Sequence, residues 1–202
     1  MRMRSIELLE QLQADVRQLI LTASHLQKEQ VSVLTLQPAA GKWSVAQVLE
    51  HLNSYGRYYL PAIERSLAKS EATAAEWFKP GWIGNYFTKI MQPGNDGKLT
   101  NKFKAPKEHT PVLKLDVNTV IHTFLEQQHH LLNLLDEAKG KNIGRIRTPI
   151  SISRVIKLKV GDTFRFLVAH EQRHFIQIRN VVSELKSTGA SRSVTPLYRQ
   201  VV

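Results

Sequence analysis

The segment AHEQRHFIQIRN, residues 169–180, contains two histidines four residues apart, with a glutamate directly after the first. On a helix, His170 and His174 would lie one turn apart on the same side, with Cβ atoms roughly 5–6 Å apart. That spacing lets both imidazoles reach one metal ion at about 2.0–2.1 Å. The string also matches the His-Glu-x-x-His motif of zinc proteases. The segment is therefore open to three interpretations: a protease, another metal protein, or a plain helix with two histidines.

The protease interpretation lacks the sequence context that it needs. Gln177 and Asn180 stand where the longer motif of one protease class requires glycine and histidine. The next acidic residue on the helix is Glu184, which follows His174 too closely to supply the usual glutamate from a separate helix. The sequence also shows no strand-rich half that could bind a peptide as an edge strand. We therefore do not expect a protease.

Four long segments show the three- and four-residue spacing of apolar side chains that is typical of amphipathic helices. They cover residues 8–26, 44–67, 117–138 and 164–185. The second opens with WSVAQ, in which Ser44 can cap the helix and Gln47 occupies the third helical position. This pattern is the signature of a capping box.

Proline and glycine punctuate the connection between the second and third helices, in FKPGW, MQPGNDGK and KAPKEHTP. We expect a short helix around Trp82–Met91 and loop elsewhere. The segment RIRTPISISRVIKLKV, residues 145–160, alternates weakly and could be extended, but the sequence identifies no partner strand. The predicted fold is all-α, a four-helix bundle with one long loop-rich connection. We expect a single domain over residues 1–202, with a core at about 4–187 and a polar C-terminal tail at 188–202.

Helical-wheel positions predict which polar side chains point inward. Glu171 falls almost at the centre of the apolar stripe of its helix, with His174 close beside it and His170 at the edge. An ionised glutamate cannot stay in an apolar core without a partner, because burying an unpaired charge costs too much free energy. His51 lies at the border of the stripe on the second helix, near Tyr55.

A single histidine on an apolar face is more often a hydrogen-bonded core residue than a metal ligand. Three inward histidines on two helices, together with a stripe-centred glutamate, favour a metal site. The third helix carries Gln128 near the middle of its stripe, whereas His122, His129 and His130 lie on or near its outer side. We expect those three histidines to be solvated and assign them no function.

The composition restricts which chemistry and which partners we expect. The chain has 202 residues, no cysteine and a formal net charge of +11, so it can form neither disulfides nor a cysteine nucleophile, and its charge suits anionic substrates. Its N-terminus mixes charges into the apolar positions and resembles neither a signal peptide nor a membrane span. We expect a cytoplasmic protein without a membrane association. A homodimer is one candidate assembly.

The stretch 138–161 is basic and could in principle follow a phosphate backbone. It contains no acidic residue and seven basic ones: Lys139, Lys141, Arg145, Arg147, Arg154, Lys157 and Lys159. Aromatic residues that could stack on bases are missing from it. We therefore expect no nucleic-acid partner and interpret the stretch as a solvated connection or as charge serving an anionic cofactor.

The segments WSVAQVLEHL and HEQRHFIQI, joined through KFKAPKEHTP, resemble the DinB-like superfamily. The resemblance extends from the first helix to Leu185. It implies a four-helix bundle with a three-histidine metal site, whose ligands map onto His51, His170 and His174. It also implies a divalent transition metal, with nickel and zinc the leading candidates. Several members resemble transferases that use bacillithiol, mycothiol or related small thiols, and others are described as metal-dependent hydrolases.

The sequence departs from the transferase pattern one turn after the first ligand. Some members carry an aspartate there, whereas this chain has Tyr55, which could hydrogen-bond a substrate or a metal-bound water but cannot act as a carboxylate base. The next residue, Gly56, is unfavourable inside a helix by about 1 kcal/mol. It could make room for a neighbouring helix or for a ligand.

Three functions follow from these observations. The leading hypothesis is a small-thiol-dependent S-transferase acting on a small molecule, in which the metal activates the thiol. The second is a hydrolase, in which metal-bound water attacks the substrate and Glu171 serves as the general base. The third is a metal-binding or stress-response protein without enzymatic activity.

Overall fold

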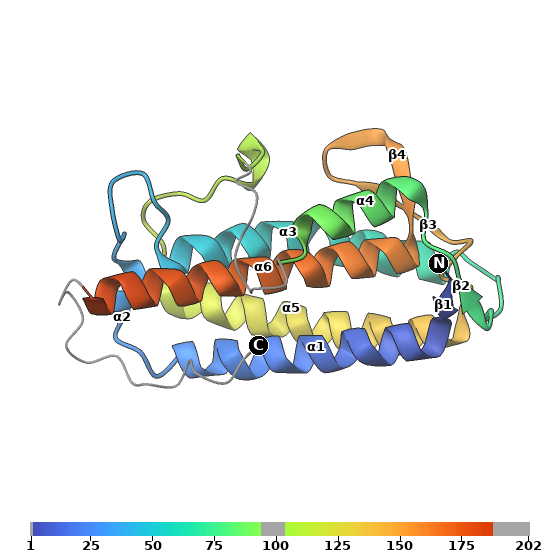
Figure 1. The fold of residues 1–202 in the computed structure, drawn as a ribbon, viewed down its shortest axis with the longest axis horizontal. Coiled ribbons are helices and arrows are strands. Elements are labelled where there is room, and N and C mark those ends of the chain that lie inside the picture. Colours follow the sequence, from blue (N-terminus) through green and yellow to red (C-terminus); the bar gives the residue numbers. More distant parts are fainter. Residues whose placement is uncertain (1, 94–103, 188–202) are drawn as a thin grey trace.

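The computed structural model describes residues 2–93 and 104–187, and four long helices dominate it (Figure 1). These helices are α1 (Ser5–Leu26), α3 (Val45–Ala68), α5 (Val117–Glu137) and α6 (Val160–Ser187). Each of α1 and α3 packs against both α5 and α6. The predicted all-α four-helix bundle is therefore confirmed. The expected polar tail, 188–202, lies outside the described residues.

Shorter helices connect and cover the bundle. They are α2 (Val31–Thr35), α4 (Trp82–Met91) and the 3-10 turns η1 (Lys107–His109) and η2 (Ala138–Gly140). Helix α4 has the bounds expected from the sequence and lies against α6 outside the four-helix core (Figure 1). Helix α2 was not predicted, because a single turn is too short to show a periodic pattern.

Two small antiparallel sheets complete the fold. One pairs β1 (Met3–Arg4) with β2 (Trp77–Phe78), and the other pairs β3 (Arg147–Ile150) with β4 (Ser153–Lys159). The partner strand that the sequence did not identify thus lies within the same segment, which folds back as a hairpin. The register shifts next to Pro149, where the missing backbone N–H is tolerated at an edge.

The start of α3 is fixed by the predicted capping box. The Ser44 Oγ accepts a hydrogen bond from the Gln47 backbone N–H at 3.3 Å, and the Gln47 Oε1 accepts one from the Ser44 N–H at 3.0 Å. Two of the N–H groups that a helix start leaves without intrahelical partners are thereby satisfied. This cap sets where α3 begins and hence which face its later residues present.

The glycine inside α3 makes room for a neighbouring helix. A Cβ atom at Gly56 would overlap the side chain of Gln127 on α5. The Gln127 side-chain amide uses this space to donate a hydrogen bond to the backbone carbonyl of Asn53 at 3.1 Å. Of the two explanations that the sequence left open, the structure supports close helix packing.

The apolar core is divided into two clusters along the bundle axis. One contains residues such as Leu12, Ile63, Leu135 and Phe164, and the other contains residues such as Leu26, Leu49, Phe124 and Ile178. The buried polar residues between them on α3, α5 and α6 include His51, Gln128, His170 and Glu171. This group, together with the half-buried His174, is the polar layer of the bundle, and it contains the candidate site.

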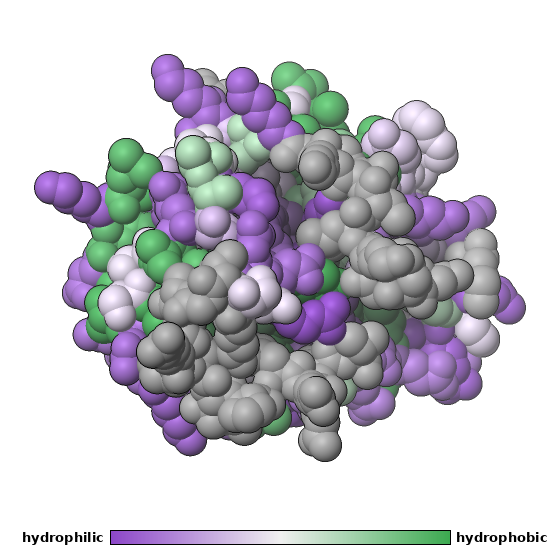
Figure 2. Space-filling model, turned by 60° about the vertical axis from the view of Figure 1, so that its left-hand side comes forward, coloured by the Kyte–Doolittle hydropathy of each residue, from purple (hydrophilic) through white to green (hydrophobic). Residues whose placement is uncertain are grey.

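The outer faces of the helices carry most of the charge. The face shown in Figure 2 is edged mainly by hydrophilic side chains, with hydrophobic side chains gathered in smaller patches. On α5, His122 and His129 are exposed and His130 is half-buried, on the side away from the polar layer. None of the helices in the described part of the chain is long and apolar enough to cross a membrane.

Candidate metal centre

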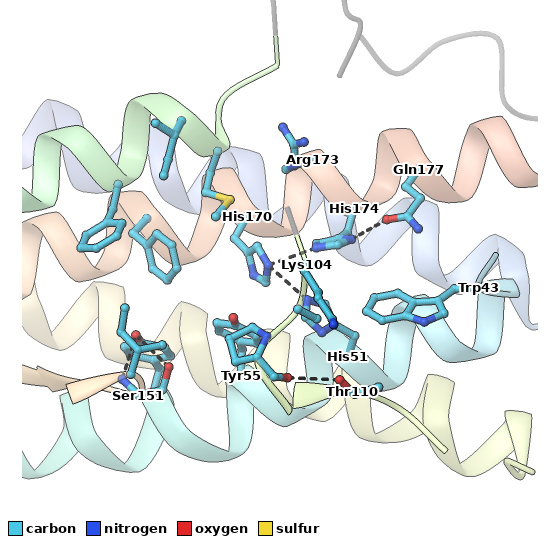
Figure 3. Close-up of a pocket in the computed structure, with 18 of the residues that line it drawn as sticks. Trp43, His51, Tyr55, Lys104, Thr110, Ser151, His170, Arg173, His174 and Gln177 are labelled. Atoms are coloured by element: carbon cyan, nitrogen blue, oxygen red, sulfur yellow. Dashed lines mark hydrogen bonds between the residues drawn. The ribbon is translucent and has the colours of Figure 1, made fainter. Parts of the chain in front are cut away.

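Three histidines from two helices converge in the polar layer (Figure 3). His51 comes from α3, and His170 and His174 come from successive turns of α6. The Nε2 atom of His170 lies 3.3 Å from that of His51 and 3.0 Å from that of His174. Nitrogens that each lie about 2.0–2.1 Å from a tetrahedral ion are about 3.3 Å apart, so the spacing fits a single ion.

The hydrogen bonds at the other ring nitrogens decide where the lone pairs point. The Nδ1 of His51 lies 2.7 Å from the backbone carbonyl oxygen of His109, and because a carbonyl only accepts, this Nδ1 carries the proton. The Nδ1 of His174 lies 2.8 Å from the Oε1 of Gln177. Because an amide oxygen only accepts, this Nδ1 also carries the proton. The Nε2 atoms of His51 and His174 therefore both present lone pairs.

Those lone pairs both face the Nε2 of His170, which can hold at most one proton. At least one close nitrogen pair is then left without a hydrogen between its atoms. A cation at the centre would satisfy all three nitrogens together. The donor set thus fits a divalent transition metal on the chemistry of its own hydrogen bonds.

Burial keeps the three imidazoles neutral in the absence of metal. It lowers the pKa of His51 to about 4, against the smaller opposing effect of the hydrogen bond to His109. It also lowers the pKa of His174 to about 3, and that of His170 well below its usual value. Neutral imidazole is the form that binds a metal, so binding requires no net release of protons at pH 7.

Aromatic rings surround the cluster and limit its contact with water. The ring of Trp43 lies 5.0 Å from that of His51, and Tyr55 lies 4.4 Å from His170, between ring centroids. Phe166 stacks on His170 at 5.7 Å, with an interplanar angle of 8°. Burial raises the pKa of Tyr55 to about 12, so its phenol stays protonated and can donate a hydrogen bond at neutral pH.

His109 belongs to the environment of the site, although no sequence pattern predicts a role for it. Its backbone carbonyl orients His51, its Nδ1 lies 2.9 Å from the Ser54 Oγ, and its ring stacks on Tyr55 at 3.9 Å. In the sequence, residue 109 belongs to a proline-flanked segment without helical periodicity. Helical-wheel positions therefore could not place it, although its chain segment contributes to the family resemblance.

Glu171 is buried with 3% of its surface exposed, and its hydrogen-bond partner is Gln128 of α5. The Gln128 Nε2 donates to the Glu171 Oε1 at 3.0 Å. Burial raises the pKa of this carboxyl to about 8, against the smaller opposing effect of the hydrogen bond. The carboxyl is therefore mostly protonated at pH 7 and lies between α5 and α6. A catalytic role for Glu171 stays a prediction.

A cavity of about 1230 Å³ adjoins the three histidines. Its described wall includes His51, His170 and His174 together with Tyr55. From the histidines it extends along α6 between α4 and the β3–β4 hairpin, whose residues also line it. The predicted ligands thus share one wall of a space large enough for a small organic molecule.

Comparison with known proteins places the chain in a family. No curated protein sequence matches it. Among solved structures, it is similar to YfiT from Bacillus subtilis, described as a probable metal-dependent hydrolase with an unusual four-helix bundle topology. The identity is 16%, the TM-score is 0.49, and the match covers 92% of this chain and 86% of YfiT. The model of the DinB superfamily matches residues 8–178, which is most of the chain. The chain therefore belongs to the DinB superfamily.

Proposed function

We propose that His51, His170 and His174 bind one divalent transition-metal ion, and that the protein is a metal-dependent enzyme acting on a small molecule in the adjoining cavity. The observation that carries this proposal is the convergence of three Nε2 atoms, with lone pairs from both helices directed at one point. Zinc and nickel are the candidate metals, because imidazole nitrogen suits both.

The surrounding residues would hold the ligand rings and leave one side open to the cavity. A metal ion bound there would supply Lewis acidity and lower the pKa of a coordinated thiol or water. The His109 carbonyl and the Gln177 side chain keep the rings of His51 and His174 oriented. Tyr55 lines the cavity as a protonated phenol, which suits it to hydrogen-bond a substrate but not to remove a proton.

The transferase is our leading candidate for the reaction. The chain has no cysteine, so an activated thiol would have to enter as a small molecule. Lys104, Arg173 and Arg179 line the cavity and would attract the carboxylates or phosphates that such thiols carry. Hydrolysis is the second candidate, since the same three-imidazole site suits it. The carboxyl of Glu171 would then have to turn from Gln128 toward the cavity to act as the base.

The test begins with protein purified without an affinity tag or added metal, whose metal content is measured. Zinc- and nickel-loaded samples are then incubated with a chlorodinitrobenzene and with an epoxide, each with and without bacillithiol, mycothiol and glutathione. Ester substrates run in parallel. His51→Asn serves as the ligand variant, and His129→Asn, on the exposed face of α5, is the matched control.

We expect thiol adducts with the parent protein and with the His129 variant, and none with the His51 variant. Ester cleavage without a thiol would replace the transferase with the hydrolase. A metal-loaded protein without turnover on any of these substrates would leave a metal-binding protein without enzymatic activity.

A further inference from the structure

One part of the cavity is walled mainly by hydrocarbon. We call this part the apolar arm. It is formed by Phe87, Ile90 and Met91 of α4, by Ile150, Ile152 and Leu158 of the β3–β4 hairpin segment, and by Phe166 of α6. These residues come from elements outside the four-helix core and from the α6 turn next to His170. The arm therefore adjoins the candidate metal centre at Phe166 and His170.

The walls of the arm are held by specific hydrogen bonds. The Tyr58 hydroxyl donates to the Ile150 carbonyl at 2.9 Å, and the Ser151 N–H donates to the Tyr59 hydroxyl at 3.2 Å. Both tyrosines belong to α3, so they attach the hairpin to the core.

On the opposite wall, the first turn of α4 is attached to α6. The Gly81 N–H donates to the buried carboxylate of Asp162 at 2.7 Å, and a Cβ at Gly84 would overlap Asp162. Since both walls are fixed to the bundle, the arm is a pre-formed space rather than a gap between loops.

A row of packed aromatic rings connects the arm with the histidines. The ring of Phe87 lies 6.2 Å from that of Phe166, which in turn stacks on His170. The ring of Tyr59 also lies 5.9 Å from that of Phe166. Ring centroids at these separations are typical of aromatic packing, and an inserted aromatic group would extend the same arrangement.

The charges on the cavity wall lie away from the arm. Among the described residues that line the cavity, the cations are Lys42, Lys104, Arg173 and Arg179, and the single acid is Glu184. Lys42 pairs with Glu184 at 2.9 Å, and four cations against one acid give the described wall a net positive charge. In Figure 3, Lys104 and Arg173 lie near the histidines, whereas Ser151 marks the hairpin side.

We infer that the cavity binds an amphipathic organic anion, with an aromatic or branched apolar body in the apolar arm and an anionic group facing Arg173 and Lys104. The body fits the hydrocarbon wall, and the anion is complementary to the excess of cations. Bound in this way, the molecule spans the cavity past the three histidines. That it is a substrate rests on the proposed function, whereas its binding does not.

The first experiment compares three probes by titration calorimetry on the full chain, metal-free and zinc-loaded. 4-Phenylbutyrate has the aromatic body and the anion, 4-phenylbutylamine has the body with the opposite charge, and butyrate has the anion alone. We expect 4-phenylbutyrate to bind at least tenfold more tightly than either of the others. Equal affinity for butyrate would exclude the apolar arm as a binding site, and equal affinity for the amine would exclude anion recognition.

The second experiment uses paired variants of α4. Ile90→Asn/Met91→Asn places two polar groups in the arm, and Ile83→Asn/Tyr86→Asn makes the same change at exposed positions of the same helix. We expect a tenfold or greater loss of 4-phenylbutyrate affinity in the first pair and no change in the second, with circular dichroism unchanged in both. Equal loss in the two pairs would overturn the inference.

Zinc affinity, measured on the same samples, separates this inference from the proposed function. Zinc binding without preference for 4-phenylbutyrate would exclude the amphipathic anion and leave the metal site standing. Selective binding of 4-phenylbutyrate without zinc binding would exclude the metal site and leave the amphipathic anion standing.

Discussion

The ring of His51 is anchored to the backbone carbonyl of His109, with 2.7 Å between the Nδ1 and the oxygen. The two residues belong to different parts of the fold, α3 and the 3-10 turn η1. The bond fixes both the tautomer and the orientation of the His51 ring. Since His109 is itself held by Ser54 and by stacking on Tyr55, the loop has a defined position over the site.

Removing the His109 side chain should therefore weaken metal binding even though His109 is no ligand. In His109→Ala the carbonyl loses the contacts that position it, and loss of such supporting interactions typically costs 10–100-fold in metal affinity. Competition with a chromogenic chelator measures the zinc affinity. Glu108→Ala, at the preceding exposed position, is the control. An unchanged affinity in His109→Ala would mean that other contacts hold the carbonyl.

Metal removal should leave the helices folded. Neither apolar cluster includes any of the three histidines, and a chain of this size buries enough surface to fold without metal. A ligand at 100 times its dissociation constant adds about 2.7 kcal/mol, which corresponds to a rise in Tm on the order of 10 °C or less. Circular dichroism with and without a chelator tests this. Loss of helicity on chelation would make the metal structural and weaken the catalytic proposals.

Replacing Glu171 by glutamine should stabilise the metal-free protein at neutral pH. Burial raises the pKa of Glu171 from 4.5 to about 8. The folded state therefore binds a proton that the unfolded state releases, and stability falls as the pH rises from about 4.5 to 8. Glutamine is neutral throughout and can keep the bond from Gln128. We expect a gain on the order of 3 kcal/mol at pH 7, which vanishes below pH 4.5.

Urea denaturation of the parent protein and of Glu171→Gln at several pH values measures this difference. A constant difference between pH 4 and pH 8 would contradict the raised pKa. Metal content and turnover of the same variant test the predicted catalytic or supporting role of Glu171. If neither changes, that role is excluded.

Gly56→Ala should destabilise the bundle although alanine favours the helix. The helix gains about 1 kcal/mol, but the new methyl group overlaps Gln127, and overpacking of this kind costs about 1–3 kcal/mol. The double variant Gly56→Ala/Gln127→Ala removes the overlap. It should be more stable than Gly56→Ala alone, as measured by urea denaturation. A stabilising single variant would show that Gln127 simply moves aside.

The sequence predicted the parts of the fold and site that depend on local spacing. The 3.6-residue period gave the four helices, and it placed His51, His170, His174, Glu171 and Gln128 on inward faces. That Gln128 is the partner of Glu171 did not follow, because the pairing depends on how α5 and α6 pack. The hairpin and the position of His109 likewise depend on contacts between segments that carry no helical period.

The polar layer also determines how the helices align along the bundle axis. Sliding α6 by one turn relative to α5 moves it about 5.4 Å. Such a shift would place the Glu171 carboxyl opposite Phe124 or Leu131, the buried apolar neighbours of Gln128 on the same face. In the two clusters such a shift would still set apolar side chains against apolar ones, whereas it would leave the buried carboxyl without its amide partner. Gln128 and Glu171 thus select one alignment at a cost in stability, as a single buried polar residue does in a coiled coil.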